Sequence, residues 1–300
     1  MPGGTVTPNA TQLSAITRLF SSAVFRELAK KGRSPTFARL IAETRIAELC
    51  TAGATVGEAF DAAFAMLRRV GHRNEYVYRA ALTSNVLLGT HSLKTASMLS
   101  EFRVGACKAD IVILNGTATV YEIKSERDSL SRLARQVENY QKVFAKIYVI
   151  ASESHVCGVT DAVPEEVGVM SLCRRSHIST FRPATENLSS LCSQNIFESV
   201  RSAEARTILK MLDFEIPNVP NTLLHGAMRD IFGQLQPMEV HKAMVETLKQ
   251  TRNLAPLGSL VDHLPDSLHA AALSIDIRRA DHDRLVGAVF TPLSNAIRWA

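Results

Sequence analysis

The chain has 300 residues, 46% hydrophobic and 21% charged, proportions typical of a soluble globular protein with one large domain or two ordinary ones. This composition excludes a largely disordered chain. The net charge is +5 overall, but residues 1–185 carry +7 and residues 186–300 carry −2, so a phosphate-bearing partner is expected on the first part of the chain. Ordinary variation in surface charge would also produce this asymmetry.

Several classes of protein are excluded by what the sequence lacks. The five cysteines are scattered without CxxC or Cys/His ligand spacing, which argues against structural zinc or an iron–sulfur cluster. The first residues have neither the charged nor the apolar segment of a signal peptide. No apolar run approaches the roughly 18–20 residues of a membrane span. We therefore expect a reducing, cytoplasmic setting without a membrane partner.

The N-terminal region is predicted to be helical. Apolar residues recur at helical spacing from Gln12 to Lys31, and a second helix is expected over Thr36–Leu49. The third follows Thr55, which forms a capping-box pattern with Glu58. A fourth is expected from about Glu75 to Leu88. The first seventy residues contain no pattern that indicates a catalytic or metal-binding site.

From about residue 98 the pattern changes to strands. Met98–Val104, Ala109–Leu114 and Ala118–Lys124 are strand-like, and Asn115-Gly116 between the last two signals a hairpin. A helix is expected over Asp128–Lys146, followed by a buried strand, Ile147–Ala151. Two short strands near Val167–Leu172 and Ile178–Arg182 would complete the sheet. After Pro183 the chain is predicted to be helical to its end.

The hairpin carries two carboxylates and a lysine. Asp110 and Glu122 are 12 positions apart, Lys124 follows two later, and strand alternation puts Glu122 and Lys124 on one face. A two-residue Asn115-Gly116 turn would leave Asp110 on the opposite face. A three-residue loop, Leu114-Asn115-Gly116 with Gly116 in the left-handed region, brings Asp110 to the face of Glu122. We predict that loop or an equivalent bulge, with Ile111, Ile113, Tyr121 and Ile123 on the other, apolar face.

These residues suit metal-assisted hydrolysis of a phosphodiester. Carboxylate oxygens are the ligands that Mg²⁺ prefers, so Asp110 and Glu122 would hold Mg²⁺ or Mn²⁺ with the backbone carbonyl of Ile123. Lys124 would orient or deprotonate the attacking water, or stabilise the developing charge. The same spacing also arises by chance on surface hairpins, so the motif needs its structural context.

That context gives a resemblance. The run Ala109-Asp110…Glu122-Ile123-Lys124…Gln136-x-x-x-Tyr140 resembles the PD-(D/E)XK nuclease superfamily, in particular its RecB-like branch with the QxxxY motif. Three runs are also similar to a poorly characterised family of bacterial proteins associated with mobile elements: Asn74–Tyr78, Glu101–Lys124 and Gln136–Tyr140. The resemblance covers about residues 74–182 and implies a restriction-endonuclease-like α-β-β-β-α-β core. Ala109 stands where the superfamily has its name-giving proline.

The resemblance also implies further site residues. Glu75, at the start of the helix before the strands, matches a position that often supplies another metal ligand, although an acid there also suits a helix N-terminus. Glu101 on the first strand is the competing ligand. Gln136 and Tyr140 would contact substrate phosphate or brace Lys124. Further cations could bind the nucleic-acid backbone or be ordinary solvated charges: Arg103, Lys108, Arg132 and Arg135.

The sequence thus predicts an α/β nuclease core at residues 74–185, between a helical N-terminal region (1–73) and a helical C-terminal domain (186–300). The expected function is metal-dependent hydrolysis of nucleic acid. The resemblance alone implies DNA as the substrate and an association with phage defence or mobile elements. The C-terminal domain would serve substrate placement, oligomerisation or partner binding, and its slightly acidic balance makes it a weaker DNA-binding candidate than the middle domain. Two alternatives stay open: a nuclease fold that binds nucleic acid without cutting it, and an interaction protein unrelated to nucleic acid.

Overall fold

The computed structural model describes residues 8–69 and 71–299. The chain folds into two compact units. Unit 1 contains the described residues of 1–84, 174–176 and 256–300, and unit 2 contains residues 85–173 and 177–255. These boundaries differ from those predicted at residues 73 and 185. The helices that follow Pro183 continue the same hydrophobic core as the sheet, so the change from strands to helices marks no boundary.

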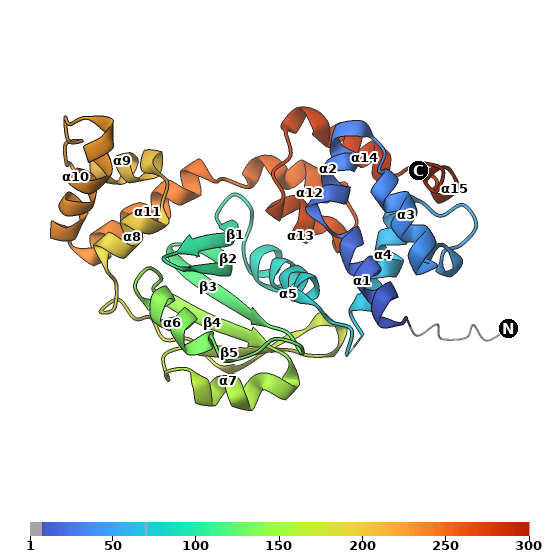
Figure 1. Ribbon diagram of the computed structural model, residues 1–300, viewed down its shortest axis with the longest axis horizontal. Helices are drawn as coiled ribbons and strands as arrows, with labels where there is room; N and C mark the ends of the chain where they lie inside the picture. Colours follow the sequence, from blue (N-terminus) through green and yellow to red (C-terminus); the bar gives the residue numbers. More distant parts are fainter. Residues whose placement is uncertain (1–7, 70, 300) are drawn as a thin grey trace. The chain divides into compact units, whose positions relative to one another are not determined.

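Unit 1 is helical (Figure 1). Its core includes an aromatic cluster in which Phe20 stacks on Tyr76 and packs against Phe60 and Phe64. The first and last parts of the sequence meet in this unit, since the helix His282–Val289 packs on the helix Ser22–Lys31. Its α-helices are α1 (Ala10–Leu19), α2 (Ser22–Lys31), α3 (Pro35–Thr44), α4 (Val56–Leu67), α5 (Glu75–Leu82), α12 (Gly258–Asp262), α13 (Asp266–Ser274), α14 (His282–Val289) and α15 (Leu293–Ala296).

Unit 2 is built on a six-stranded mixed sheet whose spatial order follows the chain (Figure 1). The pairs β3–β4 and β4–β5 are parallel and the others are antiparallel. The strands are β1 (Ser97–Val104), β2 (Cys107–Asn115), β3 (Thr117–Lys124), β4 (Lys146–Ala151), β5 (Gly168–Leu172) and β6 (Ile178–Arg182). Each strand predicted from the sequence is confirmed to within two residues at either end.

Helices cover one face of this sheet and share a single core with it. Val112 and Leu114 of β2 and Val120 of β3 join Val137 of α6 and Met244 of α11 in one buried cluster. The helices of unit 2 are α6 (Leu133–Gln141), α7 (Val156–Ala162), α8 (Ser193–Ser199), α9 (Ser202–Met211), α10 (Asn221–Gln234) and α11 (Pro237–Thr251). The predicted α-β-β-β-α-β order is confirmed by α5, β1, β2, β3, α6 and β4, with helical regions on both sides.

Three helix predictions were wrong in detail, and one helix was missed. The segment Gln12–Lys31 is two helices, because extended backbone at Ser21 interrupts it. The second helix ends at Thr44, where Arg45 takes a left-handed φ of 58° and a short 3₁₀ turn follows. The helix expected over Asp128–Lys146 spans only Leu133–Gln141. Before it the Asp128 carboxylate accepts hydrogen bonds from Ser125 within a turn, and Lys146 already belongs to β4. Helix α7 was not predicted.

No helix in the described part of the chain is long and apolar enough to span a bilayer.

The turn between β2 and β3 sets the register of the candidate site. Leu114 pairs with Ala118 and Asn115 with Thr117, so Gly116 alone lies between the strands, with φ of 71°. The predicted Leu114–Gly116 loop was therefore wrong in position, because Leu114 is still in the ladder. The positive φ of Gly116 is confirmed. The ladder runs as far as Ile111↔Tyr121, which brings Asp110 next to the part of β3 that holds Glu122 and Ile123.

Strands β1 and β2 change phase at the level of Asp110. Ala109 and Val112 belong to the same core cluster, as do Leu99 and Phe102, although strict alternation would send residues three apart to opposite faces. Glu101 lies at this level of β1 and has a φ of 52°, a left-handed conformation that side chains disfavour. The kink leaves the Asp110 side chain beside the backbone of β3.

Candidate active site

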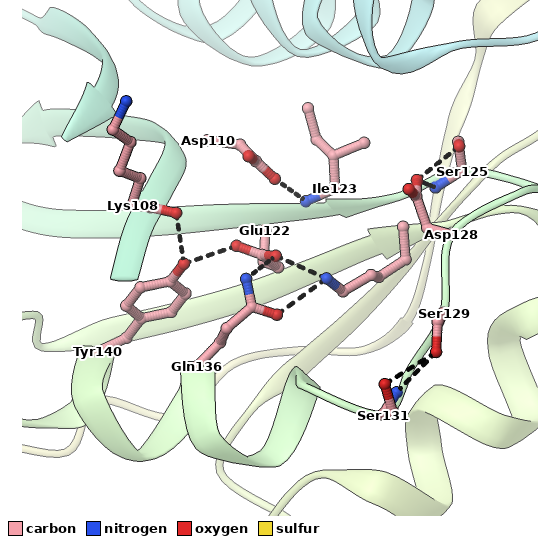
Figure 2. A network of polar contacts seen from close by, with 11 residues as sticks. Lys108, Asp110, Glu122, Ile123, Ser125, Asp128, Ser129, Ser131, Gln136 and Tyr140 are labelled. Carbon is pink, nitrogen blue, oxygen red and sulfur yellow. Dashed lines mark hydrogen bonds and ion pairs between the residues drawn. The ribbon is translucent and has the colours of Figure 1, made fainter. Parts of the chain in front are cut away.

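The centre of the site is the buried carboxylate of Glu122 (Figure 2). Its Oε1 accepts hydrogen bonds from Lys124 Nζ at 2.8 Å and from Gln136 Nε2 at 2.6 Å. Its Oε2 accepts from the Tyr140 hydroxyl at 2.8 Å. Lys124 Nζ also donates to Gln136 Oε1 at 2.9 Å. Four residues predicted from the sequence therefore form one closed network.

Two regular elements bring these side chains together. Glu122 and Lys124 are two residues apart on β3, so both point toward α6. Gln136 and Tyr140 are four residues apart on α6 and share one face of that helix. Leu133 and Val137 hold α6 against the sheet through the same core cluster. The sequence pattern alone fixes this part of the geometry.

The Glu122–Lys124 ion pair is almost completely withdrawn from water. The side chains are 2% and 8% exposed. Removing two charges from water costs several kcal/mol per ion, so such a pair is a poor source of stability and a frequent sign of function. Removing one partner alone would leave an uncompensated buried charge.

Tyr140 is held in its protonated form. Burial, with the adjacent charge of Glu122, raises the pKa of the Tyr140 phenol far above its usual range. The hydroxyl lies 2.8 Å from both Glu122 Oε2 and the backbone carbonyl of Lys108, and its single hydrogen can serve one of these acceptors at a time. Tyr140 therefore links the start of β2 to the carboxylate on β3.

Asp110 reaches the same stretch of β3 by a different route. Its Oδ2 accepts a hydrogen bond from the Ile123 backbone N–H at 2.7 Å, beyond the last ladder pair of β2 and β3. Figure 2 shows this carboxylate at the edge of β3, while Glu122, Gln136 and Tyr140 form their network on the α6 side. Ile123 lies between Glu122 and Lys124 on β3. Through this contact Asp110, which is on β2, reaches the part of β3 that carries the other two predicted catalytic residues.

The donor set fits a hard cation of the Mg²⁺ type. Oε1 of Glu122 has both its lone pairs occupied by Lys124 and Gln136, but Oε2 has a single donor and keeps room for a ligand. In the described part of the chain, no three or more His, Cys, Asp or Glu side chains gather as metal ligands. Mg²⁺ commonly takes one or two carboxylates and completes its shell with water and substrate phosphate. Asp110, Glu122 and the Ile123 carbonyl are the groups that would hold it.

A basic pocket adjoins the network. Its volume is about 390 Å³, and Lys108, Arg132, Arg135 and Gln136 line it together with Ala106 and Cys107. Gln136 thus contacts both the pocket and the Glu122 carboxylate. Two guanidinium groups and an ammonium around one cavity suit a phosphate group. Lys108, Arg132 and Arg135 are three of the four cations expected either to bind a nucleic-acid backbone or to be solvated charge, and all three line this one pocket.

The remaining predicted residues lie outside this network. Glu75 is exposed in unit 1 and pairs with Arg79 on its own helix. Glu101 is exposed on β1 and pairs with Lys108 at 3.3 Å. Arg103 is exposed, and its Nε donates to the Gly105 carbonyl. Glu75, at the start of α5, thus pairs with a cation one turn along its own helix.

Comparison with known proteins identifies the family. A family model described as bacteriophage P4 protein cII matches residues 68–253, more than half of the chain. The chain belongs to the bacteriophage P4 cII family. The match ends close to the end of unit 2 and covers the whole sheet and α6 to α11. The network and its basic pocket therefore lie within the P4 cII region.

Two individual proteins are similar to this P4 cII family member over limited regions. Protein cII of Enterobacteria phage P4 is 32% identical over 80 residues, which is 26% of this chain and 30% of the phage protein. The chain thus matches about a third of that relative. A solved protein of unknown function from Silicibacter pomeroyi is 16% identical and aligns with 48% of this chain and 92% of its own, with a TM-score of 0.31.

Proposed function

We propose that the protein is a metal-dependent nuclease that hydrolyses phosphodiester bonds, with DNA as its substrate. The observation that carries this proposal is the buried Glu122–Lys124 pair, held by Gln136 and Tyr140. Gln136 also lines the adjoining pocket, with Lys108, Arg132 and Arg135. Desolvated charge is expensive, and here it lies beside a site suited to phosphate. The relationship to a phage protein supports the proposed setting among phages and mobile elements.

Each side chain has a role in this proposal. Arg132, Arg135 and Lys108 bind substrate phosphates in the pocket. Lys124, fixed by Glu122 and Gln136, orients the attacking water and stabilises charge that develops on the phosphate. Tyr140 and Gln136 are positioning residues that hold the Glu122 carboxylate. A bound Mg²⁺ or Mn²⁺ would act as a Lewis acid on the phosphate.

Cleavage assays test the proposal directly. Purified protein is mixed with supercoiled plasmid and with linear single strands in Mg²⁺, Mn²⁺ or EDTA. We expect cutting that needs the metal and falls at least 100-fold in Glu122→Gln, Lys124→Met and Asp110→Asn. Glu138→Gln is the matched control. Glu138 is an exposed acid on α6, the helix of Gln136 and Tyr140, and it pairs with Lys142 instead of joining the network.

The outcome also separates the alternatives. DNA binding without cutting under every condition would refute the nuclease and identify a binding module. Neither binding nor cutting would indicate an interaction protein whose hairpin charges are incidental. Cutting that persists in Glu122→Gln would move the active site elsewhere.

A further inference from the structure

A second basic pocket lies at the other end of the β2–β3 hairpin from the candidate active site. Its volume is about 540 Å³, and its lining includes Gly116 at the hairpin turn and Ser97 at the start of β1. Lys94 and two lysines of α11, Lys242 and Lys249, line the same cavity. Asn253 and Gln250 add hydrogen-bonding groups. The roles proposed above use none of these residues.

The charge in this pocket is largely uncompensated. Its lining contains three lysines and a single acid, Glu246, which accepts a hydrogen bond from Gln250. Within the described ranges, Lys94, Lys242 and Lys249 form no ion pair. Uncompensated cations around one cavity attract an anion.

The pocket wall is fixed by buried contacts. Ser97 Oγ donates to the Arg252 carbonyl at 2.7 Å, which ties the end of α11 to the first residue of β1. The Arg252 guanidinium pairs with Glu204 at 2.8 Å and lies over the Phe102 ring. Lys249 and Asn253 flank this anchor in sequence, so their backbone positions are set before any ligand binds.

Both basic pockets lie along the same hairpin, beside helices of one core. Residues of α6, next to the first pocket, and of α11, next to the second, pack in the same buried cluster as β2 and β3. Lys108 lines the first pocket and Gly116 the second, and the eight residue steps from one to the other span about 26 Å in a strand. That length corresponds to about eight base pairs of duplex at ~3.4 Å each.

The spacing of the lysines favours a polymer over a small anion. Lys242 and Lys249 are seven residues apart on α11, which separates their backbone positions by ~10 Å along the helix. Two cations this far apart suit two phosphates of one backbone better than a single free phosphate. Contacts of this kind position a nucleic acid without reading its sequence.

We infer that Lys94, Lys242 and Lys249 form a distal contact for the phosphate backbone of the DNA whose scissile phosphate lies at Glu122. This inference rests on the proposed function for its choice of ligand. It assigns to α11 the role of extending the binding site along the hairpin, so that only substrates longer than about eight base pairs reach the second pocket.

Binding without metal tests this inference separately from cleavage. The affinity for DNA is measured by fluorescence anisotropy in EDTA over a range of salt concentrations, with a 20-base-pair duplex and with a hairpin whose stem has 6 base pairs. For Lys242→Ala/Lys249→Ala we expect about 10-fold weaker binding of the duplex. The slope of log affinity against log salt should fall by roughly 1.8, because two phosphate contacts are lost. Binding of the short hairpin should not change.

Controls make the result specific. Lys210→Ala removes an exposed charge on α9 of the same unit, outside the pocket lining, and should leave binding unchanged. Lys242→Gln/Lys249→Gln should repeat the loss with little disturbance to α11, and thermal unfolding checks the fold. An unchanged slope, an equal loss for the short hairpin, or an equal loss in Lys210→Ala would overturn the inference.

The two proposals fail in different ways. Lysine-dependent binding of the long duplex without any metal-dependent cutting would refute the nuclease and keep the distal contact. Metal-dependent cutting, with DNA binding that does not depend on Lys242 and Lys249, would support the nuclease and refute the distal contact. No binding of DNA by the wild-type protein would refute both.

Discussion

Glu122 is the residue through which every other group in the network acts, and Tyr140 supplies one of its three hydrogen bonds. The phenol is buried and protonated, so toward the carboxylate it acts as a hydrogen-bond donor, in competition with the Lys108 carbonyl. Groups that orient a ligating or catalytic carboxylate in this way commonly contribute 10- to 100-fold to metal affinity or activity.

We therefore predict that Tyr140→Phe lowers kcat roughly 10- to 100-fold. Because the pKa of Tyr140 is raised well above its usual range, the pH–rate profile of the wild type should show no falling limb from this group up to about pH 10. Steady-state cleavage from pH 6 to 10 measures both effects. Wild-type activity in Tyr140→Phe would mean that the hydroxyl has only a structural role.

A second prediction concerns His241 and the dependence of folding stability on pH. It is buried on α11, and burial lowers its pKa to about 4, against a partial opposing effect of Glu186. Above about pH 6.5 the histidine is neutral in both the folded and unfolded states and adds no pH dependence. Between pH 6.5 and 4 the unfolded chain takes up a proton that the folded chain cannot, so stability falls as the pH falls.

The full loss corresponds to about 3 kcal/mol, reached near pH 4. Urea unfolding at pH 7, 6, 5 and 4 should show this slope in the wild type and a flatter one in His241→Gln. His177→Gln, at an exposed position of the same unit, is the control and should keep the wild-type slope. Parallel slopes for the wild type and His241→Gln would contradict the assignment.

At the scale of elements, the β2–β3 turn decides whether the site forms. Gly116 has a positive φ and open space around its side-chain position, so an added methyl group would be strained only through the backbone. We expect Gly116→Ala to cost about 1–2 kcal/mol. Gly226→Ala is the matched control, because Gly226 also has open space but lies inside α10 with no positive φ, where alanine should stabilise by up to ~1 kcal/mol.

Chemical denaturation of both variants measures the difference. If Gly116→Ala were as stable as Gly226→Ala, the left-handed turn would not be needed. The cleavage rate of the folded Gly116→Ala protein should change little as long as the β2–β3 register, with Ile111 opposite Tyr121, is kept.

The sequence predicted the periodic parts of the molecule and missed the parts set by tertiary contacts. Strand alternation and the four-residue spacing on α6 were enough to place Glu122, Lys124, Gln136 and Tyr140 together. The phase change at Asp110 was not predictable, because it depends on a left-handed Glu101, a residue with no intrinsic preference for that conformation. The lysine pocket on α11 was missed because its members are far apart in sequence and carry no motif.

At the scale of the whole molecule, unit 1 is discontinuous in sequence. Its N-terminal helices pack with α13, α14 and α15, which come late in the chain, so they complete their core only when residues 256–299 are present. Unit 2 by contrast is nearly continuous, and the family match follows its extent.

We predict that Leu285→Ala, a substitution of a fully buried residue of α14, destabilises by about 2–5 kcal/mol. Hydrogen exchange should show the loss of protection in α1 to α4 and not in β2 and β3 if the two units unfold separately. Asp283→Ala is the control, because Asp283 is an exposed residue on the same helix, and we expect this variant to keep the wild-type protection. Equal loss of protection throughout the chain would show that the units unfold as one.

The buried lysine beside Glu122 also affects how strongly the site attracts a cation. Two carboxylates and one ammonium give the site a formal charge of only −1, although it is proposed to accept a divalent ion. We therefore expect weak metal binding to the free protein and stronger binding once a DNA phosphate adds negative charge. Because such coupling is reciprocal, metal should tighten DNA by the same factor that DNA tightens metal. The protein would then acquire its cofactor together with its substrate.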